Sequence, residues 1–212
     1  MNLIAERIDA LRKQMIAEGV SAFIVPSTDP HSGEYVPAHW ESRKWISGFT
    51  GSAGTAVITL SDGGLWTDSR YFLQAADQLQ GSGLTLFKDR LPETPTIAEW
   101  LGSVLKAGDK VGIDGWVNSI SEAMQLKKAL QSYGLELVTV DDPFHTLWKD
   151  RPSLPLDPPF ILPLEYSGEP CGQKIDRIKQ VLKENGAKGL LISALDEIAW
   201  VLNMRGNHSD RK

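Results

Sequence analysis

The sequence contains one cysteine, Cys171, among its 212 residues. A single thiol cannot form an internal disulfide, and no second cysteine is present to share a zinc ion with it. No apolar run approaches the roughly 20 residues that a membrane-spanning helix needs. Charged residues interrupt the N-terminus too early for the apolar core of a signal peptide. We therefore expect a cytoplasmic protein with no membrane partner.

Positive charge is also sparse. The chain has 22 lysine and arginine residues against 27 aspartate and glutamate residues, a formal net charge of -5. No basic block or stripe is present, which argues against a nucleic-acid partner. The 42% hydrophobic and 23% charged contents are ordinary for a globular protein. The length allows one or two domains.

Apolar periodicity predicts alternating helices and strands. Ile4, Ile8, Leu11 and Met15 share one helix face, and Gly19 is suited to end that helix. The other segments follow from similar patterns, with Asp62-Gly63 as a hairpin turn. We predict helices over 3–18, 69–79, 96–105 and 119–131, and strands over 22–25, 53–59, 64–67, 84–87, 110–113 and 135–140. This order indicates an α/β fold with a mixed β-sheet flanked by helices.

Prolines concentrate after the first domain. Six of the twelve prolines lie between Pro152 and Pro170, and a stretch so rich in proline is predicted to contain no regular element. We therefore predict a first domain over 1–150, a proline-rich linker over 151–166, and a further domain from 167 to 212.

The segment after the linker resembles the start of the chain. Residues 174–186 match 7–19 at a fixed offset, including the glycine that ends each segment, and a strand over 190–192 is expected to match 23–25. Any two amphipathic helix–strand pairs look alike, but the constant offset favours a duplication. Because the second copy stops almost at once, we expect it to be the truncated start of a second, related domain.

Two loops contain residues of potential chemical use. Gly48–Gly54 holds three glycines that could let backbone amides approach an anion, but it lacks the Gly-Lys-Ser/Thr ending of a P-loop. A tight turn is the favoured reading. The second loop carries Asp29, His31, Glu34 and His39, all metal-ligand types, without helical spacing. A surface loop is favoured there over a metal site.

Two further segments contain charged residues near predicted helix starts. Arg70 would lie in a first helical turn capped by Asp68 or Ser69, where a cation opposes the helix dipole. Such a misfit suggests either binding of a carboxylate or carbonyl, or an exposed or internally paired arginine. Asp196 and Glu197 also suit a first helical turn, where negative charge is favoured, better than a catalytic pair. No catalytic residue can be assigned.

Several segments, taken in order, resemble the first domain of cytosolic-type Xaa-Pro aminopeptidases (aminopeptidase P). They are 26–35, 45–55, 65–75, 148–152 and 194–200. The resemblance implies two related α/β domains of the creatinase/prolidase N-terminal, ribonuclease H-like type. It also implies a pita-bread catalytic domain in which two divalent metals, usually manganese, activate a water that cleaves the bond before proline. None of those metal ligands can be placed in this sequence, so we expect the dinuclear manganese in a catalytic domain absent from it.

The resemblance implies one site residue, Arg70, which contacts the bound peptide in the family. The chain is then expected to wall the substrate cleft for peptides with proline at the second position, and to be inactive alone. A homodimer is implied for the full-length enzyme. Two alternatives stay open: a non-catalytic partner-binding module of a pita-bread homologue, and a phosphate- or nucleotide-binding α/β domain that uses Gly48–Gly54.

Overall fold

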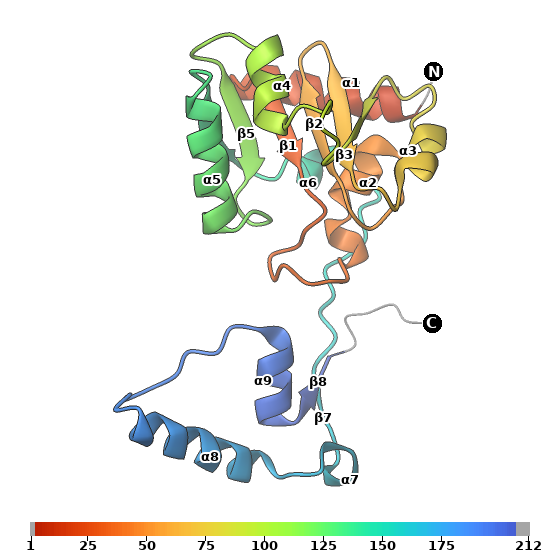
Figure 1. Cartoon of the computed structure of the whole chain (residues 1–212). Coiled ribbons are helices and arrows are strands. Elements are labelled where there is room, and N and C mark those ends of the chain that lie inside the picture. The colour runs from red at the N-terminus through yellow and green to blue at the C-terminus, as the bar shows by residue number, and fades with distance from the viewer. Residues whose placement is uncertain (1–2, 207–212) are drawn as a thin grey trace. The chain divides into compact units, whose positions relative to one another are not determined.

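The computed structural model describes residues 3–206 of the chain (Figure 1). The chain divides into two compact units, Met1–Ser153 and Leu154–Lys212, called unit 1 and unit 2 below. Among residues 3–206, no helix is both long enough and apolar enough to cross a membrane.

Unit 1 is built on one six-stranded sheet, in the spatial order β4-β3-β2-β1-β5-β6. The strands are β1 (Ala22–Val25), β2 (Thr55–Thr59), β3 (Gly63–Thr67), β4 (Thr85–Lys88), β5 (Lys110–Asp114) and β6 (Glu136–Val140). The pairs β1–β2 and β2–β3 are antiparallel, whereas β3–β4, β1–β5 and β5–β6 are parallel. The sheet is therefore mixed, as predicted from the hairpin.

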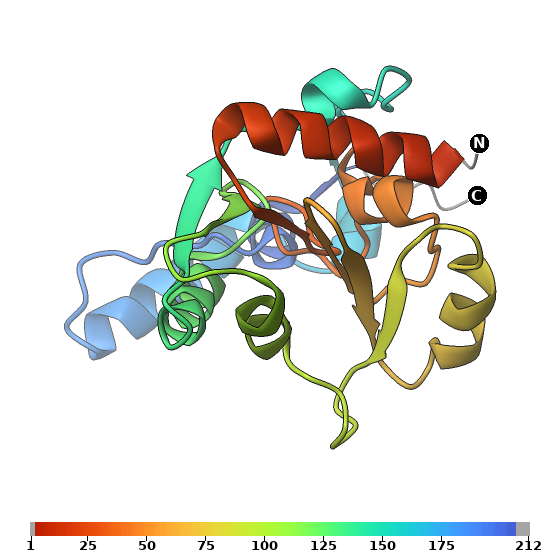
Figure 2. The same cartoon turned by 90° about the horizontal axis from the view of Figure 1, so that it is seen from above.

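Helices cover both faces of this sheet. They are α1 (Leu3–Glu18), α2 (Ser42–Ser47), α3 (Phe72–Gln78), α4 (Ile97–Val104), α5 (Ile120–Gln131) and α6 (Phe144–Leu147), with a 3-10 turn at Ala38–Trp40. Figure 2 shows α1 over one face and α4 and α5 over the other. Successive residues of β1 face opposite sides: Phe23 packs in the core under α1, and Ile24 packs in the core under α4 and α5. The central strands are buried on both sides, which explains their continuous apolar runs.

Helix ends follow the local sequence. Gly19 takes a left-handed φ of 67° directly after α1, which a residue with a side chain would adopt only with strain. Thr96 and Glu99 form a capping box at the start of α4, in which each side chain bonds to the other's backbone N–H. Ser119 and Glu122 do the same for α5.

Two predicted starts in unit 1 were wrong by two or more residues, and one helix was missed. The helix predicted from residue 69 begins at Phe72, because residues 68–70 form a turn closed by the Asp68 side chain. The strand predicted from residue 53 begins at Thr55, where pairing with Trp66 starts. Helix α2 was not predicted, since it spans six residues and its N-cap side chain makes no capping hydrogen bond.

Unit 2 contains three helices and a two-stranded sheet among its described residues. They are β7 (Phe160–Ile161), α7 (Leu164–Ser167), α8 (Cys171–Glu184), α9 (Leu195–Leu202) and β8 (Met204–Arg205). The proline-rich stretch thus has regular elements, contrary to the prediction. Strand β7 lies in a gap without proline, and Pro163 precedes α7 with a φ of -55° that suits a helix start.

The strand predicted over 190–192 does not form. No strand within residues 3–206 lies beside this segment to exchange backbone hydrogen bonds with it. The side chain of Leu191 is 92% exposed, so neither face of the segment is buried. Apolar sequence alone does not make a strand without a neighbour to pair with.

Two helix ends that the predicted duplication makes equivalent have the same backbone hydrogen bonds. Gly19 N donates to Ile16 O at 3.2 Å, and Gly186 N donates to Lys183 O at the same distance. One residue further along, the matching bonds are Val20 N to Met15 O and Ala187 N to Leu182 O, both 2.9 Å. The equivalent residues are separated by the offset found in the sequence.

Among the described residues, each unit has a cation that donates to the carbonyl of a tryptophan and also lies over the ring of that tryptophan. Arg7 donates from Nη1 to Trp45 O at 2.8 Å and lies 4.5 Å from the centroid of that ring. Lys174 donates from Nζ to Trp200 O at 2.9 Å and also lies 4.5 Å from the ring. Arg7 and Lys174 occupy equivalent positions in the predicted repeat, and each lies over a tryptophan ring.

Candidate functional site

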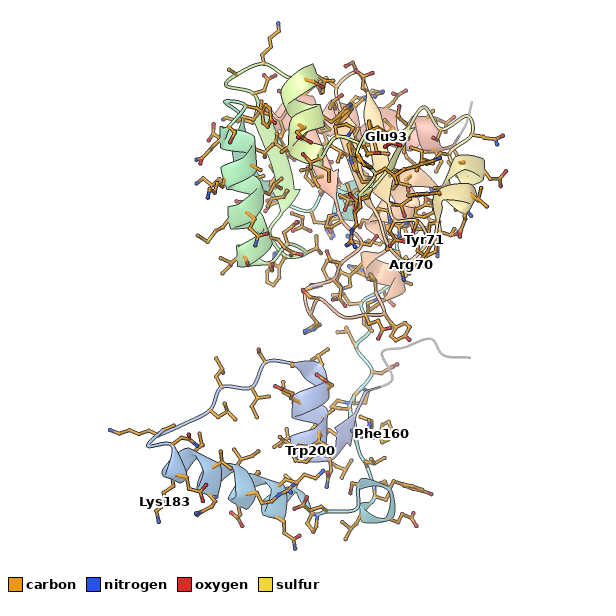
Figure 3. All side chains as sticks on the ribbon, in the orientation of Figure 1. Arg70, Tyr71, Glu93, Phe160, Lys183 and Trp200 are labelled. Carbon is orange, nitrogen blue, oxygen red and sulfur yellow. The ribbon has the colours of Figure 1, made fainter. Side chains whose placement is uncertain are left out.

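Arg70 lies on the surface between β3 and α3 and is held by one carboxylate (Figure 3). Asp68 accepts from Arg70 Nε at 3.0 Å and from Nη2 at 2.7 Å, and it also accepts from the Arg70 backbone N–H at 3.0 Å. The Arg70 side chain is nevertheless 66% exposed. The guanidinium is therefore fixed in position and open to a ligand.

The helix-dipole argument for Arg70 was wrong. Helix α3 begins at Phe72, with Tyr71 as its N-cap residue, so Arg70 precedes the helix. The side chain of Asp68 caps no helix but closes the turn before it. The positive charge of Arg70 is met by Asp68 and does not oppose the first turn of α3.

The Asp68–Arg70 pair has a defined hydrogen-bonding capacity. The hydrogen bonds that Arg70 donates lower the pKa of the Asp68 carboxyl group, and the same contact raises the pKa of Arg70. Both groups are thus charged at neutral pH. A guanidinium has five N–H donors, and two of them face Asp68. The other three can donate to neutral oxygens such as peptide carbonyls, since the charge of the arginine already has a partner.

Tyr71 connects Arg70 to the glycine-rich loop Gly48–Gly54. Its hydroxyl and the Ser52 hydroxyl are 2.7 Å apart, and this hydrogen bond lowers the pKa of Tyr71. The Arg70 guanidinium lies 5.3 Å from the centroid of the Tyr71 ring. Figure 3 shows the two side chains close together on unit 1.

The loop Gly48–Gly54 connects α2 to β2 and is held through its carbonyl oxygens. Gly48 ends α2 with a φ of 74°. Side chains from other segments then donate to four oxygens of the loop. The pairs are Arg43 with Phe49 O, Arg43 with Gly51 O, Thr67 with Ala53 O and Ser27 with Gly54 O. The loop leads into β2, as expected from the sequence, through bends at Ser52 and Ala53.

A pocket of about 200 Å³ borders the same loop. Ser52, which bonds to Tyr71, lines it together with Glu34, Trp40 and Lys44. Lys44 is paired with Glu41 at 2.8 Å. Ser52 lines the pocket and bonds to Tyr71, and the Tyr71 ring lies beside Arg70.

Two of the four residues of metal-ligand type in the loop 29–39 make structural hydrogen bonds. The buried carboxylate of Asp29 accepts from the backbone N–H groups of His31 and Gly33, at 3.0 Å each. The ring Nδ1 of His39 lies 2.6 Å from Pro152 O. Within residues 3–206, no three His, Cys, Asp or Glu side chains are placed so that they could hold a metal ion. We therefore assign no metal chemistry to these side chains.

Asp196 and Glu197 lie in the first turn of α9, as predicted. Their negative charge is favourable there because backbone N–H groups at a helix start carry partial positive charge.

Sequence reasoning missed Arg43, whose side chain anchors the loop. Arg43 is 5% exposed. It shares the buried face of α2 with Ile46 and Ser47, at the spacing of three and four residues typical of one helix face. A basic residue in phase with an apolar helix face is the signal that could have identified it.

Comparisons with known proteins show the family to which the chain belongs. A family described as the creatinase/prolidase N-terminal domain matches residues 7–147, and a second family of the same description matches 150–211. Aminopeptidase P1 of Arabidopsis thaliana is 37% identical over 206 residues, which cover 96% of this chain and 32% of that protein. The Xaa-Pro aminopeptidase ApepP of Drosophila melanogaster is 43% identical over 194 residues, which cover 91% of this chain and 32% of that protein.

Solved structures show the same relationship. The X-prolyl aminopeptidase of Caenorhabditis elegans, described as a cytosolic enzyme with a di-nuclear active site, matches with a TM-score of 0.85 and 30% identity, over 98% of this chain and 35% of that one. The N-terminal domain of the cytoplasmic peptidase PepQ from Mycobacterium tuberculosis matches with a TM-score of 0.52 and 27% identity, over 68% of this chain and 98% of that one. The chain therefore spans about a third of the length of the curated relatives it matches.

Proposed function

Because the chain belongs to the creatinase/prolidase N-terminal domain family, we propose that it is the non-catalytic front part of an Xaa-Pro aminopeptidase. In this role it walls the substrate cleft and presents Arg70 to the peptide. The proposal is supported by the names of the relatives and by one observation on the chain itself. That observation is an exposed guanidinium held by a single carboxylate, with three donors open to a ligand.

The proposed substrate is a peptide with proline at its second position. Arg70 donates to a carbonyl oxygen of that peptide and so fixes its orientation. The metals that activate water belong to a catalytic domain outside this chain, which is therefore inactive as a peptidase by itself. We further propose a cytoplasmic location and a homodimer for the complete enzyme.

We also propose that unit 2 is the start of a second domain related to unit 1. The equivalent contacts of Arg7 with Trp45 and of Lys174 with Trp200 support this relationship. The two successive matches of one family description support it as well.

Substitution of Arg70 in the complete enzyme tests the proposed role. Hydrogen bonds to charged groups contribute about 1.5–3 kcal/mol, so we expect Arg70→Ala to lower kcat/KM on Xaa-Pro peptides by roughly 10- to 100-fold. Arg177→Ala is the matched control, since Arg177 is similarly exposed and is paired with one carboxylate, Glu169, at 2.8 Å. Unchanged kcat/KM for Arg70→Ala, or an equal loss for both variants, would contradict the role.

A further inference from the structure

Arg43 is a buried cation whose N–H groups donate to neutral oxygens. None of the ion pairs among residues 3–206 includes it. Burial lowers the pKa of Arg43 to about 10, so it is still charged at neutral pH. Its Nε donates to Ser27 Oγ at 2.8 Å, and its other nitrogens donate to Phe49 O and Gly51 O. A buried charge is costly, and here it fixes the path of the glycine-rich loop.

The loop fixed by Arg43 packs directly against Tyr71. A Cβ atom on Gly51 would lie 2.8 Å from Tyr71 Cδ1 and 2.3 Å from Phe49 Cζ. The backbone of Gly51 therefore lies against both rings, which meet edge-on with centroids 5.8 Å apart. Only glycine allows this approach, so the position of the loop sets the position of the Tyr71 ring.

Ser52, the next residue of the loop, forms a hydrogen bond with the hydroxyl group of Tyr71. The two hydroxyl oxygens are 2.7 Å apart. Tyr71 is then held along its ring by Gly51 and Phe49, and at its hydroxyl by Ser52. Its ring in turn lies 5.3 Å from the guanidinium of Arg70, on the surface where the proposed ligand binds.

We infer that Ser52 and Tyr71 are positioning residues, which set the orientation of Arg70 toward its ligand from a loop anchored by Arg43. This inference rests on the proposed role of Arg70. It goes beyond that role by assigning a purpose to the glycine-rich loop, namely to hold the ring beside the guanidinium. Asp68 fixes one edge of the Arg70 guanidinium, and Tyr71 restricts rotation of the guanidinium about that edge.

The Ser52–Tyr71 hydrogen bond is suited to a test because it lies at the surface. A single hydrogen bond between exposed groups adds little to folding stability, so Ser52→Ala and Tyr71→Phe are expected to leave the fold intact. Any effect of these variants on ligand binding then reports on Arg70 and not on unfolding. Arg43 is unsuitable for this purpose, since its removal would leave buried oxygens without donors.

The experiment uses the 212-residue chain and two measurements. The first is the NMR order parameter of the Arg70 Nε–H group, which reports how tightly the side chain is held without any ligand. The second is a titration with the tripeptide Ala-Pro-Ala. We expect each variant to lower the order parameter and to weaken peptide binding by about 2- to 10-fold. In an Arg70→Ala background, neither variant should weaken binding further.

A control variant and three outcomes separate the possible results. Ser61→Ala removes an exposed serine hydroxyl that bonds to Asp62 at 2.6 Å, and it should change neither measurement. If Arg70→Ala leaves peptide binding unchanged, or no binding occurs, the proposed role of Arg70 fails, and the inference that rests on it fails as well. If Arg70→Ala weakens binding while Ser52→Ala and Tyr71→Phe alter neither measurement, the inference fails. An equal loss in the Arg70→Ala background would also overturn it, because the residues would then act independently of Arg70.

Discussion

At the scale of single residues, two arginines of unit 1 illustrate opposite uses of the same side chain. Arg43 is buried and donates to neutral oxygens of its own fold. Arg70 is exposed, pairs with a carboxylate on one edge and keeps its other edge open. A guanidinium serves both purposes because its planar fork fixes several donors at once. In the sequence, Arg43 differs from Arg70 by standing in phase with Ile46 on one helix face.

Asp114, at the end of β5, is a buried carboxylate whose ionisation is unfavourable in the folded state. Desolvation raises its pKa, and the nearby carboxylates of Asp142 and Asp141 raise it further. The backbone N–H of Trp116, which donates to Asp114 Oδ1 at 2.8 Å, and the positive charge of Arg151 offset this in part. The folded state therefore holds the Asp114 proton more tightly than the unfolded chain does.

This raised pKa predicts how stability depends on pH at Asp114. The stability that Asp114 contributes is fully present below its pKa in the unfolded chain, about 3.9 for aspartate. This contribution is lost as the pH rises through the pKa of Asp114 in the folded state. Asp114→Asn keeps an oxygen for Trp116 and removes the charge. We expect the variant to be more stable than the wild type at pH 7, with the difference vanishing below about pH 4. Urea unfolding at both pH values measures this, with the exposed Asp157→Asn as control. A less stable variant at pH 7 would contradict the assignment.

At the scale of elements, the contact of Lys174 with Trp200 holds α8 against α9. Lys174 is 3% exposed, and its ammonium donates to Trp200 O at 2.9 Å and to Asn203 Oδ1 at 2.6 Å. Lys174→Met keeps an apolar stem of similar length but removes both donors. Leaving buried acceptors unpaired costs about 1–3 kcal/mol.

We therefore expect Lys174→Met to destabilise unit 2 by about 1–3 kcal/mol. Hydrogen exchange of the α9 amides under native conditions measures the free energy of opening of this unit. Lys179→Met is the matched control, because Lys179 lies on the same helix with an exposed side chain and a weak contact of 3.4 Å to Asp176. Equal exchange in both variants would mean that the Lys174 contact does not stabilise the unit.

The elements that could be predicted from sequence are those with local signals. The boundaries of β1 and the C-terminal end of α1 matched, because a buried apolar run and a glycine with positive φ mark them. Residues 190–192 failed because a strand depends on partners that a local pattern does not contain. Helix α2 was missed because it is short and its burial, including that of Arg43, depends on distant segments.

The same distinction applies to the candidate site. Arg70 could be selected from the sequence because it stands in a recognisable motif, although the dipole argument for it was wrong. The roles of Ser52, Tyr71 and Arg43 could not be selected, since they depend on contacts across the fold. Ser52 and Tyr71 are 19 positions apart in sequence and meet only once the sheet has formed.

At the scale of the whole molecule, the two units differ in how much apolar surface they bury. Both hydrophobic clusters belong to unit 1. Among the described residues of unit 2, Val201 is the one hydrophobic side chain that is buried. Several large apolar side chains of this unit are exposed instead, including Leu190, Leu191 and Trp200. Burial of apolar surface is the main source of folding stability, so the two units should differ strongly in stability.

We expect hydrogen exchange to separate the two units. Amides of the central strands β1, β2 and β5 should exchange only through global unfolding, while those of α8 and α9 should exchange through a local opening of much lower free energy. Mass spectrometry of deuterated peptides from the 212-residue chain measures this. If unit 2 is the start of a second related domain, protection of α8 and α9 should rise in the complete enzyme, because further polypeptide then covers Leu190 and Leu191. Equal protection of both units in the isolated chain would show that unit 2 is complete by itself, and the proposed second domain would then be wrong.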